Sequence, residues 1–341
     1  MTTRLVALAG TISVLVVLGL ASLDAQNTAR TASTYSPPRT TWGDPDFQGV
    51  YTNSNEYATP LERPKEFEGK QLKDLSADEI ARVRQQATKQ AIAGLANGEV
   101  RGPDEWWLQI LDLGKRNQPW LIVDPPDGHV PPLTAEAAQR LKGVRTKSSF
   151  LGGPFNGPED LGMLERCISR SVPGSMIPVM YGNNYQIIQT PGFIVITYEI
   201  IHEARVIPLD GRPHVGANVR AHMGDPRGHW EGNSLVVETT NFTGKAPMLI
   251  AGIPGGVRGP RPSTVNMKTI ERFTRVGNDR IDYEMTIEDP EIQADKWTIS
   301  YPMFLDPEYQ FYEYACHEDN TAVRNFITTS QYERGLRGKA N

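Results

Sequence analysis

Histidine and glutamate side chains gather in the C-terminal part of the chain, where five of the six histidines lie between residues 202 and 317. Histidine is the side chain best suited to proton transfer near neutral pH. Glu199 and His202 are three residues apart, so they face opposite ways on a continuous strand and converge only at a bend, a bulge or a helical turn. We predict that this pair transfers protons, with a structural histidine at a strand end as the alternative.

Two more acid/base candidates lie on strand faces that also carry aromatic residues. Glu271 shares a face with Phe273, and His317 shares a face with Glu313 and Phe311. A carboxylate in apolar surroundings has a raised pKa and can act as an acid or a base. The residues predicted to be catalytic are His202, Glu199, Glu271 and His317.

A turn rich in arginine is a candidate for binding the substrate. Arg205, His214 and Arg220 flank the turn at Asp210-Gly211. The planar guanidinium group suits a carboxylate or an oxyanion, and a solvated loop with salt bridges is the alternative. The residues predicted to bind substrate are Tyr198, Arg205, Arg220, His214, Glu313 and Tyr314.

Several familiar site patterns are missing. No spacing of histidine, cysteine and acidic residues matches a zinc site or a facial triad, so we predict no metal. No glycine pattern for a dinucleotide or a phosphate follows a strand, and there is no Gly-x-Ser-x-Gly elbow, so we predict no cofactor. The glycine-rich segment 252–260 is either a lid over a barrel mouth or a long connection.

The N-terminus and the cysteines point to export. Arg4, an apolar run of about 16 residues and Ala25 form the pattern of a signal peptide over 1–25, cleaved after Ala25, whereas a membrane anchor needs about 20 apolar residues. We predict a secreted or periplasmic protein without a stable membrane anchor. In an oxidising compartment Cys167 and Cys316, the only cysteines, are expected to pair. A reactive thiol beside His317 is the alternative.

Composition and periodicity predict a mainly β domain. The chain has 341 residues and a net charge of −5, which argues against a nucleic-acid partner, and its 31 glycines and 26 prolines favour many turns and short strands. A capping box at Ser76 and Glu79 predicts a helix over 76–95. Further short helices are predicted at 103–107 and 134–142. The predicted strands cover 47–52, 192–199, 203–209, 229–231, 234–242, 267–276, 280–288, 297–304 and 309–317.

These elements predict an antiparallel up-and-down curved sheet or barrel with a few helices packed outside, and a two-sheet sandwich is the alternative. We predict a flexible lead-in at 26–41, a single β-rich domain at 42–330 with a helical insertion at about 70–145, and a tail at 331–341.

Several motifs are similar to those of a family of uncharacterised secreted bacterial proteins. They are Gly-Asp-Pro-Asp-Phe-Gln-Gly-Val at 43–50, Val-Asp-Pro-Pro-Asp-Gly at 123–128, Pro-Leu-Asp-Gly-Arg-Pro-His at 208–214, Gly-His-Trp-Glu-Gly at 228–232, Glu-Arg-Phe-Thr at 271–274 and Tyr-Ala-Cys-His-Glu at 314–318. The resemblance covers most of the chain after the signal peptide and brings no settled activity. Lys268 stands where this family suggests a histidine. The segment 47–51 also resembles the entry strand of lipocalin-like barrels.

Two functions from different classes follow. The first is a cofactor-independent acid/base enzyme, a lyase, isomerase, cyclase or hydrolase, that acts on a small organic molecule in a barrel or cleft. The second is a periplasmic barrel that binds a small ligand without catalysis, and a structural envelope protein is a third possibility. The sequence identifies neither the substrate nor the oligomeric state.

Overall fold

The computed structural model describes residues 35–57, 59–83, 85, 118–144, 152–179, 181–248 and 261–336, without the side chain of His202. The predicted signal peptide, the predicted helix at 103–107 and the glycine-rich segment 252–260 lie outside the described residues. The described residues from Pro37 onward belong to one compact unit.

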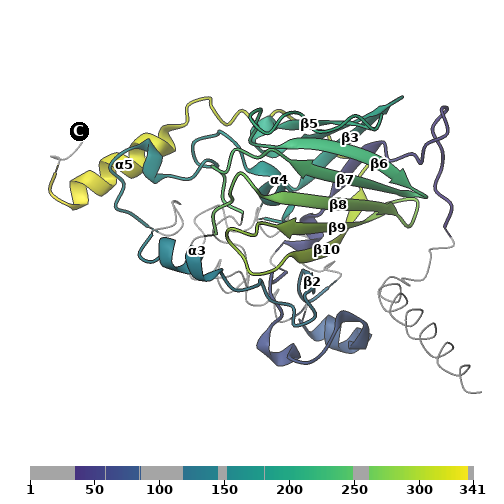
Figure 1. The fold of residues 1–341 in the computed structure, drawn as a ribbon, viewed down its shortest axis with the longest axis horizontal. Helices are drawn as coiled ribbons and strands as arrows, with labels where there is room; N and C mark the ends of the chain where they lie inside the picture. The colour runs from purple at the N-terminus through teal and green to yellow at the C-terminus, as the bar shows by residue number, and fades with distance from the viewer. Residues whose placement is uncertain are drawn as a thin grey trace, which may run out of the picture. The chain divides into compact units, whose positions relative to one another are not determined.

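The described residues contain one antiparallel sheet that is nearly closed into a barrel (Figure 1). Its hydrogen-bonded path runs β5-β4-β3-β1-β10-β9-β8-β7-β6, and β2 pairs with β10 outside this path. The strands are β1 (Gly49–Thr52), β2 (Ile122–Asp124), β3 (Asn184–Thr190), β4 (Phe193–Tyr198), β5 (Ala204–Pro208), β6 (Asp225–Glu231), β7 (Ser234–Thr240), β8 (Lys268–Arg275), β9 (Arg280–Glu288) and β10 (Trp297–Leu305).

The strand order is an up-and-down meander that returns to its start. β1 pairs with both β3 and β10, so the first and the last strand in chain order are neighbours in the middle of the path. The two ends of the path, β5 and β6, are consecutive in the chain and lie side by side. At this seam a Cβ on Gly228 of β6 would lie 2.7 Å from Leu209 and 2.8 Å from Ile207. The side chains of β5 therefore pack directly against the backbone of β6.

Alternation along the strands separates a dense interior from a wetted exterior. On β9 the buried residues Ile281, Tyr283, Met285 and Ile287 alternate with half-buried polar ones, as the period of two requires. The hairpins predicted around 232–233 and 277–279 are confirmed, since Glu231 pairs with Ser234 and β8 pairs with β9. The predicted curved sheet is thus confirmed.

A short helix packs against the sheet, and the other helical segments lie elsewhere in the described chain. All six residues of α4 (Ser171–Met176) are buried, and Pro173 fits there because the first helical turn needs no donor from it. The other α-helices are α3 (Ala135–Arg140) and α5 (Thr321–Glu333), and residues 77–83 are helical. The 3₁₀ turns are η1 (Ser54–Glu56), η2 (Lys65–Phe67), η3 (Leu72–Asp74), η6 (Pro158–Asp160) and η7 (Ile200–His202).

Some of the predicted elements need correction. The segment 309–317 is not a strand, although its aromatic residues favour one, and α5 follows it. The sequence patterns did not identify β3 or β2, and β6 begins at Asp225, in a stretch expected to be a loop. The capping box at Ser76 is confirmed, because the backbone N–H of Glu79 donates to Ser76 Oγ at 3.2 Å and that of Ser76 donates to Glu79 Oε2 at 2.9 Å.

Candidate functional site

A buried ion pair crosses the interior of the sheet. Nη2 of Arg205, on β5, donates to Oε1 of Glu271, on β8, at 2.9 Å, and Nη1 donates to Oε2. Tyr283 completes the arrangement, since its hydroxyl donates to Oε1 of Glu271 at 2.8 Å. The two charged side chains are at most 1% exposed. The carboxylate of Glu271 is therefore fully engaged by protein donors and enclosed.

The pKa values of the groups around this pair depend on its burial and its charges. Burial alone would lower the pKa of Arg205, but the adjacent charge of Glu271 outweighs burial and raises the pKa well above its usual value. Tyr198 lies beside the pair, with its ring centroid 5.7 Å from the Arg205 guanidinium carbon. Burial raises the pKa of Tyr198, so its hydroxyl stays protonated.

Glu199 is the predicted catalytic residue whose surroundings best suit proton transfer. It lies half-buried at the end of β4, where Oε2 accepts from Asn184 at 2.7 Å and Oε1 accepts from the hydroxyl of Tyr309. Burial and the hydrogen bond to Glu199 raise the pKa of Tyr309, which keeps the phenol protonated as a donor. The carboxylate of Glu199 and the phenol of Tyr309, which are 110 residues apart in the chain, are thus joined by a hydrogen bond.

The chain turns sharply directly after Glu199. Ile201 has φ 61° and ψ 8°, a left-handed conformation that a β-branched residue rarely adopts. Such strain costs about 1–3 kcal/mol and is typically found at functional sites. The turn brings Glu203 back, so that its carbonyl accepts from the backbone N–H of Tyr198 at 2.9 Å. The chain is thus bent after Glu199, with a kink at Ile201 inside the short 3₁₀ turn, and the side chain of His202 lies outside the described residues.

The predicted site residues of segment 309–317 differ in how far they are exposed to solvent. Tyr314 is half-buried and stacks on Tyr181 with 6.4 Å between ring centroids, and burial together with Tyr181 raises its pKa to about 12. Glu313 and His317 are exposed. The shared strand face expected for these two residues does not exist, because the segment has no strand geometry.

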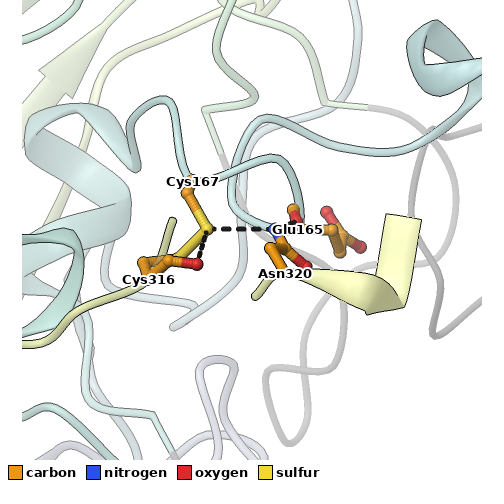
Figure 2. The surroundings of a disulfide bond; sticks show 4 residues. All are labelled: Glu165, Cys167, Cys316 and Asn320. Atoms are coloured by element: carbon orange, nitrogen blue, oxygen red, sulfur yellow. Dashed lines mark hydrogen bonds between the residues drawn. A yellow bond between two sulfur atoms is a disulfide. The ribbon is translucent and has the colours of Figure 1, made fainter. Parts of the chain in front are cut away.

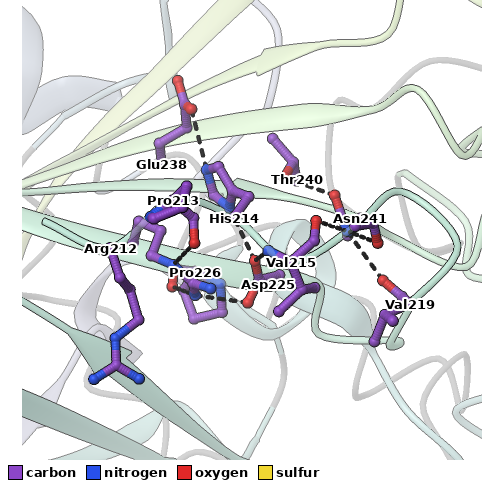
Figure 3. Close-up of polar contacts among 12 residues, drawn as sticks. Arg212, Pro213, His214, Val215, Val219, Asp225, Pro226, Glu238, Thr240 and Asn241 are labelled. Atoms are coloured by element: carbon purple, nitrogen blue, oxygen red, sulfur yellow. Dashed lines mark hydrogen bonds and ion pairs between the residues drawn. The ribbon is translucent and has the colours of Figure 1, made fainter.

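The predicted arginine-rich turn lies on the outside of the seam. His214 is bridged between two carboxylates, with Nδ1 3.0 Å from Asp225 Oδ2 and Nε2 3.2 Å from Glu238 Oε1 (Figure 3). Arg220 is exposed and donates to the carbonyl of Ala217. Lys268 lies 3.5 Å from Glu238 on the same outer face. Arg205 does not belong to this cluster, because it points into the barrel.

The predicted disulfide is present and ties the C-terminal segment to the loop before α4. Cys167 and Cys316 are joined across a sequence separation of 149 residues. Beside the bond, the side-chain amide of Asn320 donates to the carbonyl of Glu165 at 3.0 Å (Figure 2). The reactive-thiol alternative is therefore wrong for Cys316 in this structure.

A basic pocket on the exterior was not predicted. It has a volume of about 610 Å³ and combines apolar walls with four basic side chains. The backbone N–H of Met248 donates to the carbonyl of Arg261 at 2.8 Å, which holds the 245–248 and 261–263 segments together at one wall. The lining residues are Leu141, Val144, Leu161, Gly162, Met163, Arg166, Ile168, His222, Lys245, Ala246, Pro247, Arg261 and Pro262.

The charges in this pocket are all of one sign. Arg166, Lys245 and Arg261 line it, and its described lining includes no carboxylate. Burial lowers the pKa of Arg261, and the nearby charge of Glu62 partly opposes this. A desolvated guanidinium gains more from an anion than an exposed one does. Sequence reasoning missed this site because its residues come from five separate segments of the chain and form no motif.

Within the part of the chain that the structure describes, no three histidine, cysteine or acidic side chains are close enough together to hold a metal ion. Within the same residues, no helix has the length and apolar character to cross a membrane. The disulfide is compatible with a secreted or periplasmic protein.

Comparisons of the chain with models of protein families, with curated proteins and with solved structures give no match. The resemblance to a family of secreted bacterial proteins therefore stays a prediction. The likeness to lipocalin-like barrels extends only to the nearly closed sheet.

Proposed function

We propose that this protein is a secreted or periplasmic binding protein for a small organic anion with an apolar body. The observation that carries the proposal is the pocket of about 610 Å³, in which Arg166, Lys245 and Arg261 stand among apolar walls. Ligand pockets typically measure about 300–1,000 Å³ and combine apolar lining with a few placed polar groups.

The chemistry of the lining selects the ligand class. The cations favour a carboxylate, sulfonate or phosphate head, and guanidinium groups bind these oxyanions with two parallel hydrogen bonds. Val144 and Ile168 are exposed and offer apolar surface for the remainder of the ligand. A neutral lipid would offer no negative charge to Arg166, Lys245 and Arg261, and a small inorganic ion would leave the apolar wall uncovered.

Decanoate is a suitable probe, because it joins a carboxylate to a flexible apolar chain. We expect decanoate to bind the purified protein in calorimetry and decanol to bind more weakly. Lys245→Ala should weaken decanoate binding up to about fivefold, since an exposed charge contact contributes up to about 1 kcal/mol. Lys296→Ala is the matched control, because Lys296 is exposed and does not line the pocket. Equal decanoate affinity in all three proteins would refute the site.

The contact between Glu199 and Tyr309 favours a second candidate, an acid/base enzyme acting on a small organic molecule. Glu199 would take a proton from the substrate and return a proton to the product, so that its carboxylate is regenerated, and Tyr309, which stays protonated, would hold that carboxylate through its hydrogen bond. The strained turn at Ile201 supports this assignment, because strain is kept where the surrounding structure holds a functional geometry.

Proton exchange in heavy water tests the enzyme without knowledge of the substrate. A mixture of small keto acids and ketones is incubated with the protein in D₂O, and mass spectrometry measures the deuterium that they incorporate. An enzyme of this type should accelerate exchange in at least one compound, and Glu199→Gln should remove the acceleration while Glu288→Gln keeps it. Exchange that is no faster than in buffer would reject this candidate.

A further inference from the structure

Arg170 is a buried cation whose three guanidinium nitrogens have no hydrogen-bond partner among the described residues. The residue is 1% exposed and stands directly before α4. Its backbone N–H donates to Oε2 of Glu203 at 3.1 Å, so that carboxylate oxygen is held by the main chain and not by the guanidinium group. Burial lowers the pKa of Arg170, and the nearby Tyr185, Tyr181, Glu203 and Tyr301 only partly oppose this effect.

Arg205 shows how this protein compensates a buried guanidinium group when the partner belongs to the chain. It has the same degree of burial, and two of its nitrogens donate to Glu271, which also accepts from Tyr283. Buried charges are normally paired in this way, because an isolated buried ion is strongly unfavourable. The Arg170 guanidinium group therefore has no hydrogen-bond partner among the described residues, although the carboxylate of Glu203 lies within electrostatic range.

Other polar atoms near α4 also lack partners. Ser175 Oγ and Asn53 Oδ1 are buried and have no hydrogen-bond partner among the described residues. The amide of Asn53 donates to the hydroxyl of Tyr185 at 3.0 Å, and that hydroxyl donates to the carbonyl of Ser175 at 3.1 Å, so these atoms belong to one cluster. Tyr185 and Tyr301 both lie within electrostatic range of Arg170. The Ser175 hydroxyl and the Arg170 guanidinium group are donors that an enclosed anion can satisfy, whereas Asn53 Oδ1 is an acceptor and needs a donor such as water.

We propose that Arg170 binds a small inorganic anion of halide size at the end of the barrel beside α4. The residues of this region, Tyr185, Tyr301 and all of α4, are buried, so the site is enclosed and favours a compact ion. An anion there supplies the acceptor that the guanidinium lacks. It also links α4, which precedes β3, to the strands that carry the two tyrosines. The site is separate from the proposed ligand pocket, because Arg170 does not line that pocket.

Bromide in place of a bulky anion tests the proposal on the full chain. The thermal midpoint is measured while sodium bromide replaces sodium gluconate at constant ionic strength. Above the dissociation constant, each tenfold rise in bromide should raise the midpoint by about 2 °C for a domain of this size. Arg170→Met should abolish the dependence, whereas Arg82→Met, at an exposed helical position, should keep it.

Two further measurements separate the alternatives. Glu203→Gln should keep the bromide dependence, and loss of that dependence would show that Glu203 shapes the site. Crystals grown in bromide should give an anomalous peak at hydrogen-bond distance from the Arg170 guanidinium group, which decides the question even if Arg170→Met does not fold. A midpoint independent of bromide, together with no peak, would overturn the proposal. Lys245→Ala should leave the bromide response unchanged, so failure of the ligand pocket and failure of this site are distinguishable.

Discussion

The Arg205–Glu271 pair offers the sharpest test of how the barrel interior is held together. Glu271→Gln keeps the shape of the side chain and keeps an oxygen that can accept from Tyr283, but it removes the charge. Arg205, whose side chain is 1% exposed, then remains as a buried cation beside a neutral amide. Removing one partner of a buried ion pair costs about 3–5 kcal/mol, and we expect that loss in the free energy of unfolding.

Urea denaturation at pH 7 measures this loss. Tyr283→Phe removes one hydrogen bond to a charged acceptor and should cost about 1.5–3 kcal/mol. Glu288→Gln, on the outer face of β9, is the matched control and should change stability by less than about 0.5 kcal/mol. The double variant Arg205→Met/Glu271→Met should lose less than the sum of the single variants, because no charge is left without a partner. A loss below about 1 kcal/mol for Glu271→Gln would refute the reasoning.

Three further predictions concern the ends and the outside of the sheet. Replacing Cys167 and Cys316 by alanine should lower the free energy of unfolding by up to about 5 kcal/mol, because the bond spans 149 residues, and urea curves with and without reductant check this. Gly228→Ala should lower the free energy of unfolding by about 1–3 kcal/mol, since its Cβ would lie 2.7 and 2.8 Å from side chains at the seam. Gly277→Ala is the control and should lower it less in the same assay, because its nearest contact is at 3.5 Å. Burial alone would raise the pKa of Asp225, but hydrogen bonds from the Val215 backbone, His214 and Arg227 outweigh burial and lower the pKa. The ionised Asp225 therefore stabilises the folded protein above about pH 4, and this contribution is lost as the pH falls further. Asp225→Asn should therefore flatten the dependence of the thermal midpoint on pH below about pH 4, and an unchanged slope would contradict this.

The sequence predicted the sheet well where local patterns determine it. The alternation over 267–276 and 280–288 and the turn between them gave the hairpin of β8 and β9, and parity placed Glu271 on the interior face. The same reasoning failed at 309–317, where aromatic residues favour a strand. There the contact of Tyr309 with Glu199 and the disulfide at Cys316 hold the chain in an irregular course.

Contacts between distant segments could not be predicted from spacing. Arg205 and Glu271 are 66 residues apart and meet only because β5 and β8 face each other across the interior. Arg170 gave no local indication of burial, since it lies between serines near a proline and a glycine, a composition typical of a surface turn. The basic pocket likewise needs five segments of the chain to come together.

The distribution of charge inside this barrel limits where function can reside. Tyr51, Tyr185, Tyr198, Tyr283 and Tyr301 are at most 1% exposed, and Glu271 lies enclosed with them. These buried side chains hold their groups in fixed positions, and protein interiors of this kind leave few voids larger than a water molecule. Groups that can meet an organic molecule must therefore lie at the ends or outside the wall, which is where Glu199 and the basic pocket are found. By the same argument, only an ion small enough to be enclosed can pair with Arg170, so ligand binding at the pocket and anion binding at Arg170 should be independent of each other.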